Sequence, residues 1–512
     1  MSEDVTRRAV LGGLAASAVA VGTSDASSAT SGDVVPRWDA LDELDATALA
    51  ESIRRGDITA REMLDRTIAR IESLNPVVNA VSLRHFELAA ESLRQLDRQA
   101  PFSGVPFLLK DLWVAMAGTR VTNGSRFFEQ LSYDHDGELI KRFRRAGFVI
   151  VGKAASPELG LTTTTESALH GAVRNPWQLD RVAGGSSGGS AAAVSAGMVP
   201  IAHASDGGGS IRIPASCCGL VGLKTSRGRV PFPIRRFQGW GGLSTHFAVT
   251  RSVRDAARLL DVVAGPETGA SVLQQPAAGL FMRAIESSPR PLKIARLPAP
   301  FSGGAVDPEC ERAVDTVAAL CRQLGHRVEV ATPVIDYKGY TAAFGTIIAV
   351  QTLAALRERE RQMGRACTEA DVEPVTWLIA QSGQRIDGLT FASAETTLDE
   401  AARQSADFFK DWDLLLSPTL AQAPVELGKL GLSPTNFAQY AADVTAFSPY
   451  TSLANVTGQP SISLPLGWSR SGLPLGVMFT ARFADEATLL SLSRTLEREL
   501  PWYDRRPTFR AS

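Results

Sequence analysis

The chain has 512 residues, 44% of them hydrophobic, so it is long enough to bury a sizeable core. Its 53 basic and 54 acidic residues give a net charge of −1, and they form no long run of like charge. This balance disfavours nucleic acid or an anionic membrane surface as a partner. The five cysteines are an odd number and have no metal-ligand spacing, so we expect free thiols rather than a metal site or structural disulfides.

The first 36 residues read as an export signal followed by a linker. Arg7 and Arg8 precede a short apolar stretch, 11–21, and a segment rich in small residues continues to about Asp33. This pattern is typical of a secretory signal, and the adjacent arginines favour the twin-arginine route, which exports folded proteins. The apolar stretch is shorter than the about 20 residues that span a bilayer, so we expect no stable membrane insertion. N-terminal disorder without a targeting role is the alternative.

A capping box predicts the first long helix. Thr59 stands at the cap and Glu62 follows three positions later, at the start of an amphipathic segment. We expect this helix to run to about Leu74, where Asn75-Pro76 ends it.

Apolar runs and helical patterns then alternate along the chain. Strands are predicted at 107–109, 148–151, 292–295, 327–330, 414–416, 461–465 and 475–479. Helices are predicted at 138–146, 191–197, 310–324, 340–363, 392–409 and 486–499. This alternation favours an α/β architecture with much of the sheet parallel. The Gly/Pro-rich segment 230–245, with Phe232, Phe237 and Trp240, is predicted to be a long loop that either shapes a pocket or covers the surface with buried aromatics.

The residues of chemical interest surround two glycine-flanked serines, Ser186 and Ser210, which stand 24 positions apart (210 − 186). The first lies in Gly184-Gly185-Ser186-Ser187-Gly188-Gly189-Ser190 and the second in Asp206-Gly207-Gly208-Gly209-Ser210-Ile211-Arg212-Ile213-Pro214. Upstream, Lys110 ends the apolar run 105–109. Glycines let backbone N–H groups crowd around a reacting atom, and a lysine in an apolar run can lose its proton and act as a base. Together these parts could make a Ser–Ser–Lys hydrolase.

Ser210 is the predicted nucleophile. A serine hydroxyl needs an adjacent base and a stabilised oxyanion. The backbone N–H groups of Gly207, Gly208, Gly209 and Ser210 are the predicted oxyanion donors, and they precede a helix start, which favours negative charge. A phosphate-binding loop is the structural rival, but the pattern Gly-x-x-x-x-Gly-Lys-Ser/Thr is absent from the chain.

Lys110 is the predicted base, and Ser186 would relay the proton from Ser210 to it. A strand-end lysine paired with Asp111 is the alternative interpretation of Lys110. A Ser210–His203–Asp206 triad is a second alternative, disfavoured because Ser210 does not stand in a Gly-x-Ser-x-Gly elbow followed by the expected Asp and His. The histidines show no metal-ligand spacing.

The chain strongly resembles the amidase signature family of amide hydrolases. The two serine motifs and Lys110-Asp111 stand where that family has them. The resemblance covers roughly residues 40 to 505 and continues through Asn175-Pro176-Trp177, Gly219-Leu220-Val221-Gly222-Leu223-Lys224, Thr250-Arg251-Ser252-Val253, Asp413-Leu414-Leu415-Leu416-Ser417-Pro418-Thr419 and Thr457-Gly458-Gln459-Pro460.

The resemblance implies one catalytic domain over residues 37–512, a single large α/β/α unit around a mixed, mostly parallel sheet. It implies a catalytic triad of Lys110, Ser186 and Ser210, a cis peptide at Gly185–Ser186 and an acyl-enzyme intermediate. Supporting hydrogen bonds would come from Ser187, Asp206 and Arg212. No cofactor is implied. The expected partner is a small amide, and both a monomer and a homodimer stay open.

Three segments resemble the 6-aminohexanoate cyclic-dimer hydrolase branch of that family. They are 161–170, the form Asp206-Gly207-Gly208-Gly209-Ser210 of the second serine motif, and Ser216-Cys217-Cys218-Gly219. This resemblance implies linear or cyclic amides with aliphatic spacers as substrates. Aryl acylamides, urethanes and peptide C-terminal amides stay open as substrates. An amidotransferase subunit that amidates mischarged tRNA, and a catalytically inactive binding protein, are the alternatives from other functional classes. The export signal and the charge balance disfavour the former, and the intact triad positions disfavour the latter.

Overall fold

A computed structural model describes residues 38–270, 272 and 275–509. Its main strands are β1 (Val81–Arg84), β2 (Pro106–Lys110), β3 (Val149–Ala154), β8 (Ile201–Asp206), β9 (Val221–Lys224), β10 (Thr245–Thr250), β11 (Lys293–Arg296), β12 (Arg327–Val330), β13 (Leu414–Pro418), β14 (Ser461–Trp468) and β15 (Pro474–Ala481). They form one 11-stranded sheet in the order β1-β3-β2-β8-β10-β9-β14-β15-β13-β11-β12. Two small hairpins lie outside it, β4 (Glu166–Ser167) with β5 (Gly171–Ala172), and β6 (Arg174–Asn175) with β7 (Gln178–Val182).

The sheet is mixed, as predicted, but the prediction that it is mostly parallel is wrong. The strand pairs β2–β3, β2–β8, β11–β12 and β11–β13 are parallel. The other six neighbouring pairs, which run from β8 through β10, β9, β14 and β15 to β13 and include β1–β3, are antiparallel. Local connectivity accounts for two of these six pairs. A short turn joins β14 to β15, and an irregular loop rather than a crossover helix joins β9 to β10, and such connections allow antiparallel pairing.

The helices near the centre cover the sheet in two groups. The first comprises α6 (Gly188–Ser195) and α7 (Arg212–Cys218), which contact each other, and α10 (Pro308–Gln323), which packs on β13, β14 and β15. The second comprises α8 (Val253–Val263), α9 (Leu280–Ala284) and α16 (Glu486–Glu499), which contact one another, with α5 (Glu138–Arg145) packed on α8. One buried apolar cluster joins residues of both groups and of the sheet, as a single α/β unit requires.

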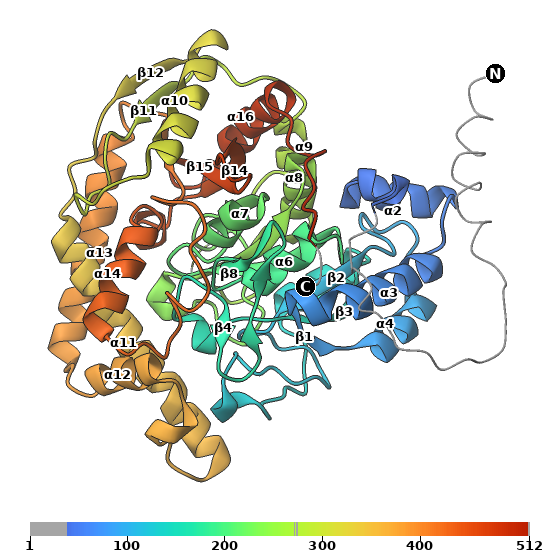
Figure 1. The fold of residues 1–512 in the computed structure, drawn as a ribbon, viewed down its shortest axis with the longest axis horizontal. Coiled ribbons are helices and arrows are strands. Elements are labelled where there is room, and N and C mark those ends of the chain that lie inside the picture. The colour runs from blue at the N-terminus through green and yellow to red at the C-terminus, as the bar shows by residue number, and fades with distance from the viewer. Residues whose placement is uncertain (1–37, 271, 273–274, 510–512) are drawn as a thin grey trace.

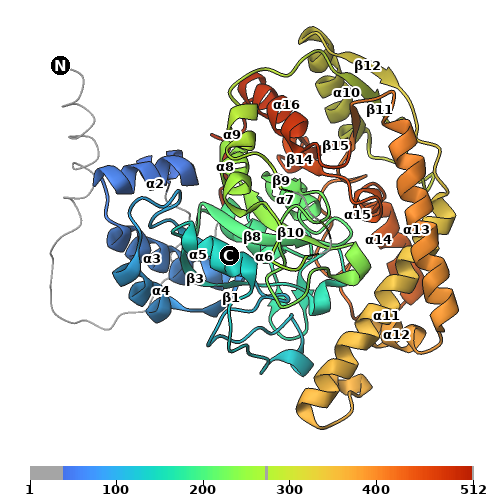
Figure 2. The ribbon, with the colours of Figure 1, turned by 180° about the vertical axis from the view of Figure 1, so that it is seen from behind.

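The remaining helices lie at the two sides of the molecule. Figures 1 and 2 show α2 (Ala46–Arg55), α3 (Ala60–Val78) and α4 (Phe86–Ser92) at one side, and α11 (Tyr337–Met363), α12 (Pro374–Gly383), α13 (Gly388–Phe408) and α14 (Phe437–Phe447) at the other. The short α15 (Ser452–Val456) contacts α13. Single 3-10 turns complete the description: η1 (Ala40–Glu43), η2 (Leu93–Gln95), η3 (Arg126–Phe128), η4 (Glu158–Gly160), η5 (Trp240–Gly242) and η6 (Glu369–Asp371).

The predicted capping box opens α3, but the predicted end of that helix is wrong. Thr59 accepts a hydrogen bond from the Glu62 N–H, and the Glu62 carboxylate accepts one from the Thr59 N–H. The helix then runs through Pro76 to Val78. A proline in the last turn removes only one backbone hydrogen bond, and the left-handed Asn79 closes the helix by donating its N–H to the carbonyl of Asn75.

Candidate active site

The parallel pair β2 and β8 creates the site. Lys110 is the last residue of β2, and Ser205 and Asp206 are the last residues of β8. Because β2 and β8 are parallel neighbours, their carboxyl ends meet at one edge of the sheet. Ser186 lies in the turn between β7 and α6, and Ser210 in the turn between β8 and α7, so both turns follow a strand and enter a helix.

Lys110 is completely buried and contacts two serines. Its Nζ lies 2.7 Å from Ser186 Oγ and 2.9 Å from Ser205 Oγ. Burial lowers the pKa of Lys110 from 10.5 to about 7, against a smaller opposing effect of the Asp206 charge. The ammonium pairs with these hydroxyls rather than with Asp111, whose carboxylate accepts hydrogen bonds from Thr122. A substantial fraction of Lys110 is therefore neutral near pH 7 and able to accept a proton.

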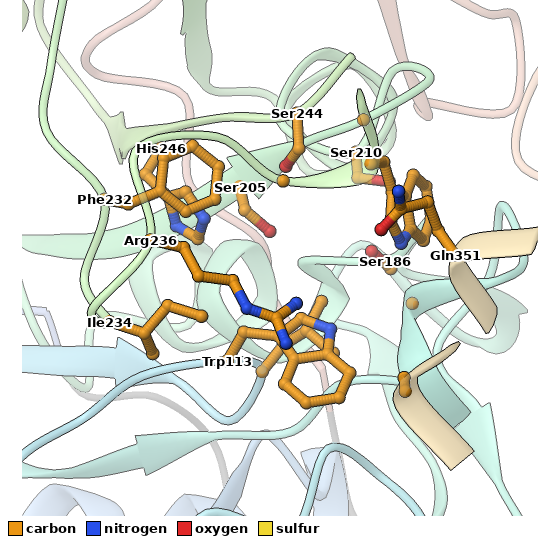
Figure 3. A pocket seen from close by; sticks show the side chains of 16 residues that line it. Trp113, Ser186, Ser205, Ser210, Phe232, Ile234, Arg236, Ser244, His246 and Gln351 are labelled. Carbon is orange, nitrogen blue, oxygen red and sulfur yellow. The ribbon is translucent and has the colours of Figure 1, made fainter. Parts of the chain in front are cut away.

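Ser186 and Ser210 line the same cavity, which has an empty volume of about 620 Å³ including its mouth. Figure 3 shows both side chains at one end of this cavity, with Trp113, Phe232 and Arg236 on other parts of its wall. Ser186 is almost fully buried, and Ser210 is half-buried. The peptide bond between Gly185 and Ser186 is cis, as the family resemblance implies.

Ser187, one of the predicted supporting residues, makes two hydrogen bonds to the backbone of β8 at Ser205. Its Oγ donates a hydrogen bond to the Ser205 carbonyl and accepts one from the Ser205 N–H. Ser205 in turn holds Lys110 through its own hydroxyl. The sequence did not predict Ser205, because a serine in an apolar strand carries no glycine-rich signal. A correct prediction that β2 pairs with β8 would have placed Ser205 beside Lys110.

The glycine-rich turn before Ser210 offers backbone donors, but not all four that the sequence predicted. The Gly209 N–H donates to Asp206 Oδ1 at 2.8 Å, so this donor is already occupied and the prediction for Gly209 is corrected. Within the described residues, the N–H groups of Gly207, Gly208 and Ser210 have no protein acceptor. A Cβ at position 207 would lie 2.7 Å from the Trp240 ring, so the turn requires a glycine there.

Asp206 and Arg212 form a buried ion pair that fixes this turn. Arg212 donates from Nε and Nη2 to both carboxylate oxygens of Asp206 at 2.9 Å. Burial opposes the ionisation of Asp206, but the charge and hydrogen bonds of Arg212 hold the pKa of its carboxyl well below the ordinary value. Asn455 of α15 donates to Asp206 Oδ1, and Thr451 donates to the Gly208 carbonyl. The sequence predicted neither Asn455 nor Thr451, because each stands more than two hundred positions from its partner.

His203 does not have the environment of a catalytic base. Its Nδ1 accepts a hydrogen bond from the Lys110 backbone N–H, and its Nε2 lies 3.1 Å from Nδ1 of His246. This network places the His203 proton on Nε2. Burial, with the Lys110 charge as a second cause, lowers the pKa of His203 to about 3. Both ring nitrogens are occupied and Asp206 pairs with Arg212, so the Ser210–His203–Asp206 arrangement has no geometric basis.

The five cysteines are free and buried, as predicted: Cys217, Cys218, Cys310, Cys321 and Cys367. Burial raises the pKa of the Cys217 thiol and of its neighbour Cys218. In the part of the chain that the structure describes, no group of three His, Cys, Asp or Glu side chains could hold a metal ion. One helix there, α11, is long and apolar enough to cross a membrane by length and composition; it packs on α12 and α13.

Comparisons with known proteins agree on one family. The family model described as Amidase matches residues 62–490. The 6-aminohexanoate-cyclic-dimer hydrolase of Paenarthrobacter ureafaciens is 39% identical over 479 residues, covering 90% of this chain and 96% of that protein. A solved structure of 6-aminohexanoate cyclic dimer hydrolase complexed with substrate superposes with a TM-score of 0.87 and 38% identity, over 91% of this chain and 99% of the other.

A more distant likeness is to a bacterial aryl acylamidase of the amidase signature family. Its solved structure has a TM-score of 0.82 and 28% identity, and the match covers 90% of this chain and 98% of that one. The same fold therefore serves relatives whose names specify different amides.

Proposed function

The chain belongs to the amidase family and is an amide hydrolase; we propose that it cleaves carboxamide bonds by a Ser–Ser–Lys relay with an acyl-enzyme intermediate. The observation that carries the proposal is the contact between Lys110 Nζ and Ser186 Oγ at 2.7 Å, at the end of a cavity that Ser210 also lines. Near pH 7 a buried lysine with a pKa of about 7 can take a proton and return it.

The first step is attack of Ser210 Oγ on the amide carbonyl carbon. The serine proton passes to Ser186 while Ser186 passes its own proton to Lys110, so the relay ends on the ammonium. Negative charge develops on the carbonyl oxygen, where the N–H groups of Gly207, Gly208 and Ser210 donate to it. One such donor contributes about 3 kcal/mol to the transition state.

The second step reverses the direction of the proton. Lys110 returns its proton through Ser186 to the amide nitrogen, the C–N bond breaks and the amine leaves. Water then attacks the Ser210 ester while its proton passes through Ser186 to Lys110. The bond between the acyl carbon and Ser210 Oγ breaks, Lys110 returns the proton through Ser186 to Ser210 Oγ, and the carboxylic acid is released. Ser205 holds Lys110 in place during both half-reactions, and the Asp206–Arg212 pair keeps the donor turn in position.

We propose linear or cyclic aliphatic amides, such as the 6-aminohexanoate cyclic dimer, as substrates. The relative and the solved structure named for that compound support an aliphatic spacer, as do the apolar side chains of Trp113, Phe232 and Ile234 in the cavity wall. An aryl acylamide or a urethane is the second candidate, since a relative with an aryl acylamidase name shares the fold and aromatic side chains line the cavity.

The test is amine release from a panel containing the cyclic dimer, a linear aliphatic amide, an anilide and a urethane. Wild type should release amine fastest from the aliphatic members, and the Ser210→Ala variant should release none. If the anilide were turned over much faster than every aliphatic amide, the enzyme would instead be an aryl acylamidase. Full activity of the Ser210→Ala variant would contradict the proposed mechanism.

We also propose that the enzyme is exported by the twin-arginine route. Arg7 and Arg8 before the apolar stretch 11–21 support this proposal, and they lie outside the described residues. Replacing both with lysine should leave folded, active enzyme in the cytoplasm, because the signal is read separately from the fold. Unchanged export of the double variant would contradict it.

A further inference from the structure

The cavity carries one permanent charge on its wall. Its charged lining residue is Arg236, in the loop between β9 and β10, while no Asp or Glu of the described chain lines it. Figure 3 shows the Arg236 side chain extending into the cavity beside Trp113, with Ser186 and Ser210 on another part of its wall. A guanidinium remains charged at any physiological pH.

The Arg236 guanidinium has no hydrogen-bond or ion-pair partner among the described residues. Its backbone N–H donates to the Ile234 carbonyl. The charge of Arg236 lowers the pKa of Tyr133 and of Glu358 on α11, although burial raises the pKa of Tyr133 overall; the Glu358 carboxylate is already bonded to Arg361 and Gln362. An arginine fork that points into a ligand cavity without an acceptor is prepared to bind a planar anion.

Apolar side chains line part of the cavity wall: Phe232 and Ile234 precede Arg236 in the same loop, and Leu112 and Trp113 come from the segment after β2. The same lining also holds the polar side chains of Ser205, Ser244, His246 and Gln351. The apolar part suits a methylene chain that carries a polar group at each end. One end would place an amide carbonyl at Ser210, and the other would reach Arg236.

We propose that Arg236 makes the enzyme prefer linear aliphatic amides that carry a carboxylate over uncharged amides such as the cyclic dimer, because the anionic end of a linear substrate pairs with its guanidinium while Ser210 attacks the amide. This inference rests on the proposed amide hydrolysis and adds the charge class of the substrate. Arg236 acts on binding and positioning, at a distance from the reacting atoms. The carboxylate belongs either to the acyl part or to the amine part of the substrate, and the two arms of the test separate these sources.

Two pairs of substrates share one scissile amide and one chain length. N-hexanoyl-6-aminohexanoate carries the carboxylate on the amine side, and N-hexyl adipamate carries it on the acyl side. Each is paired with the alcohol in which a hydroxymethyl group replaces the carboxylate. In wild type, the anionic member of at least one pair should have a kcat/KM about tenfold or more above its alcohol, mainly through a lower KM.

The matched variants are Arg236→Ala and Arg235→Ala, because both arginines are exposed but only Arg236 lines the cavity. Arg236→Ala should reduce the preference to about twofold or less. Arg235→Ala should keep it, and Arg236→Glu should reverse it. Equal rates within both pairs in wild type, or equal loss of preference in the two alanine variants, would overturn the proposal.

A binding measurement separates this inference from the proposed function. The same four compounds are titrated calorimetrically into the Ser210→Ala variant, which keeps Arg236 and cannot turn over. If no amide is hydrolysed but the anionic compounds bind about tenfold more tightly than their alcohols, the hydrolytic proposal fails and the role of Arg236 stands. If the amides are hydrolysed and the four compounds bind equally, the role of Arg236 fails alone.

Discussion

Replacing Lys110 with methionine should abolish activity and change how stability depends on pH. The variant removes the amine that accepts the Ser186 proton and keeps an apolar stem in the same buried space. A completely buried ammonium destabilises the folded protein. The base that the relay needs therefore lowers the free energy of unfolding.

The magnitude follows from the pKa. Burial lowers the pKa of Lys110 from 10.5 to about 7, so between these values the unfolded chain binds one proton more than the folded protein. The stability of wild type therefore rises with pH in this window by about 1.4 kcal/mol per pH unit from this group. Below pH 7 both states are protonated, and the destabilisation reaches its full value of about 5 kcal/mol. Between pH 6 and 9 the lysine accounts for a rise of about 2 to 3 kcal/mol.

Methionine removes this pH dependence but leaves the Ser186 and Ser205 hydroxyls without their partner, at about 1 to 3 kcal/mol each and independently of pH. The stability of the variant relative to wild type should thus fall by about 2 to 3 kcal/mol from pH 6 to pH 9. Guanidinium denaturation midpoints of both proteins at several pH values measure this difference, with Ser210→Ala as an inactive control that keeps the wild-type slope. A difference between Lys110→Met and wild type that is constant across pH would refute the reasoning.

Three further predictions concern the same site. Because only neutral Lys110 accepts a proton, kcat/KM should rise about tenfold per pH unit on an acidic limb ending near pH 7, and a limb ending below pH 5 would contradict the lysine base. Arg212→Met leaves the Asp206 carboxylate buried and uncompensated, so it should lower unfolding free energy by about 3 to 5 kcal/mol at pH 7, with Arg212→Lys less damaging; unchanged denaturation midpoints would exclude a structural role. Gly207→Ala brings a Cβ within 2.7 Å of the Trp240 ring, so kcat should fall about a hundredfold through the displaced donor turn, whereas a variant as active as wild type would show that this turn is not needed.

Much of the fold was predictable where local signals agree with packing. Helix α16 has the predicted bounds Glu486–Glu499, since its cap and its apolar stripe both mark it. The extension of α3 past Pro76 was not predictable, because it depends on how Asn79 closes the helix and on the side chain of Asn75, which pairs with Val81. Sheet direction was misjudged for a related reason, since the pairing partner of each strand is set by contacts far apart in sequence.

The residues of the candidate site also divide into those that have a local sequence signal and those that do not. Lys110, Ser186 and Ser210 have local signals, an apolar run and glycine-rich turns. The structure places both serines on one cavity and buries Lys110 behind it in contact with Ser186. Ser205 and Asn455 have none, because a strand serine and a helix asparagine gain their roles only from neighbours that the fold supplies. Because their contacts depend on how the chain folds, the composition and residue spacing of the sequence could not have predicted these two residues.

The central claim is that Ser210 carries an acyl group whose formation requires Lys110. Intact-mass spectrometry of the enzyme quenched during turnover of a slow aliphatic amide, followed by peptide mapping, tests it directly. We predict an adduct with the mass of the acyl part on the peptide that contains Ser210, absent in Ser210→Ala and formed orders of magnitude more slowly in Lys110→Ala. An adduct on another residue, or one that forms at the wild-type rate without Lys110, would contradict the account.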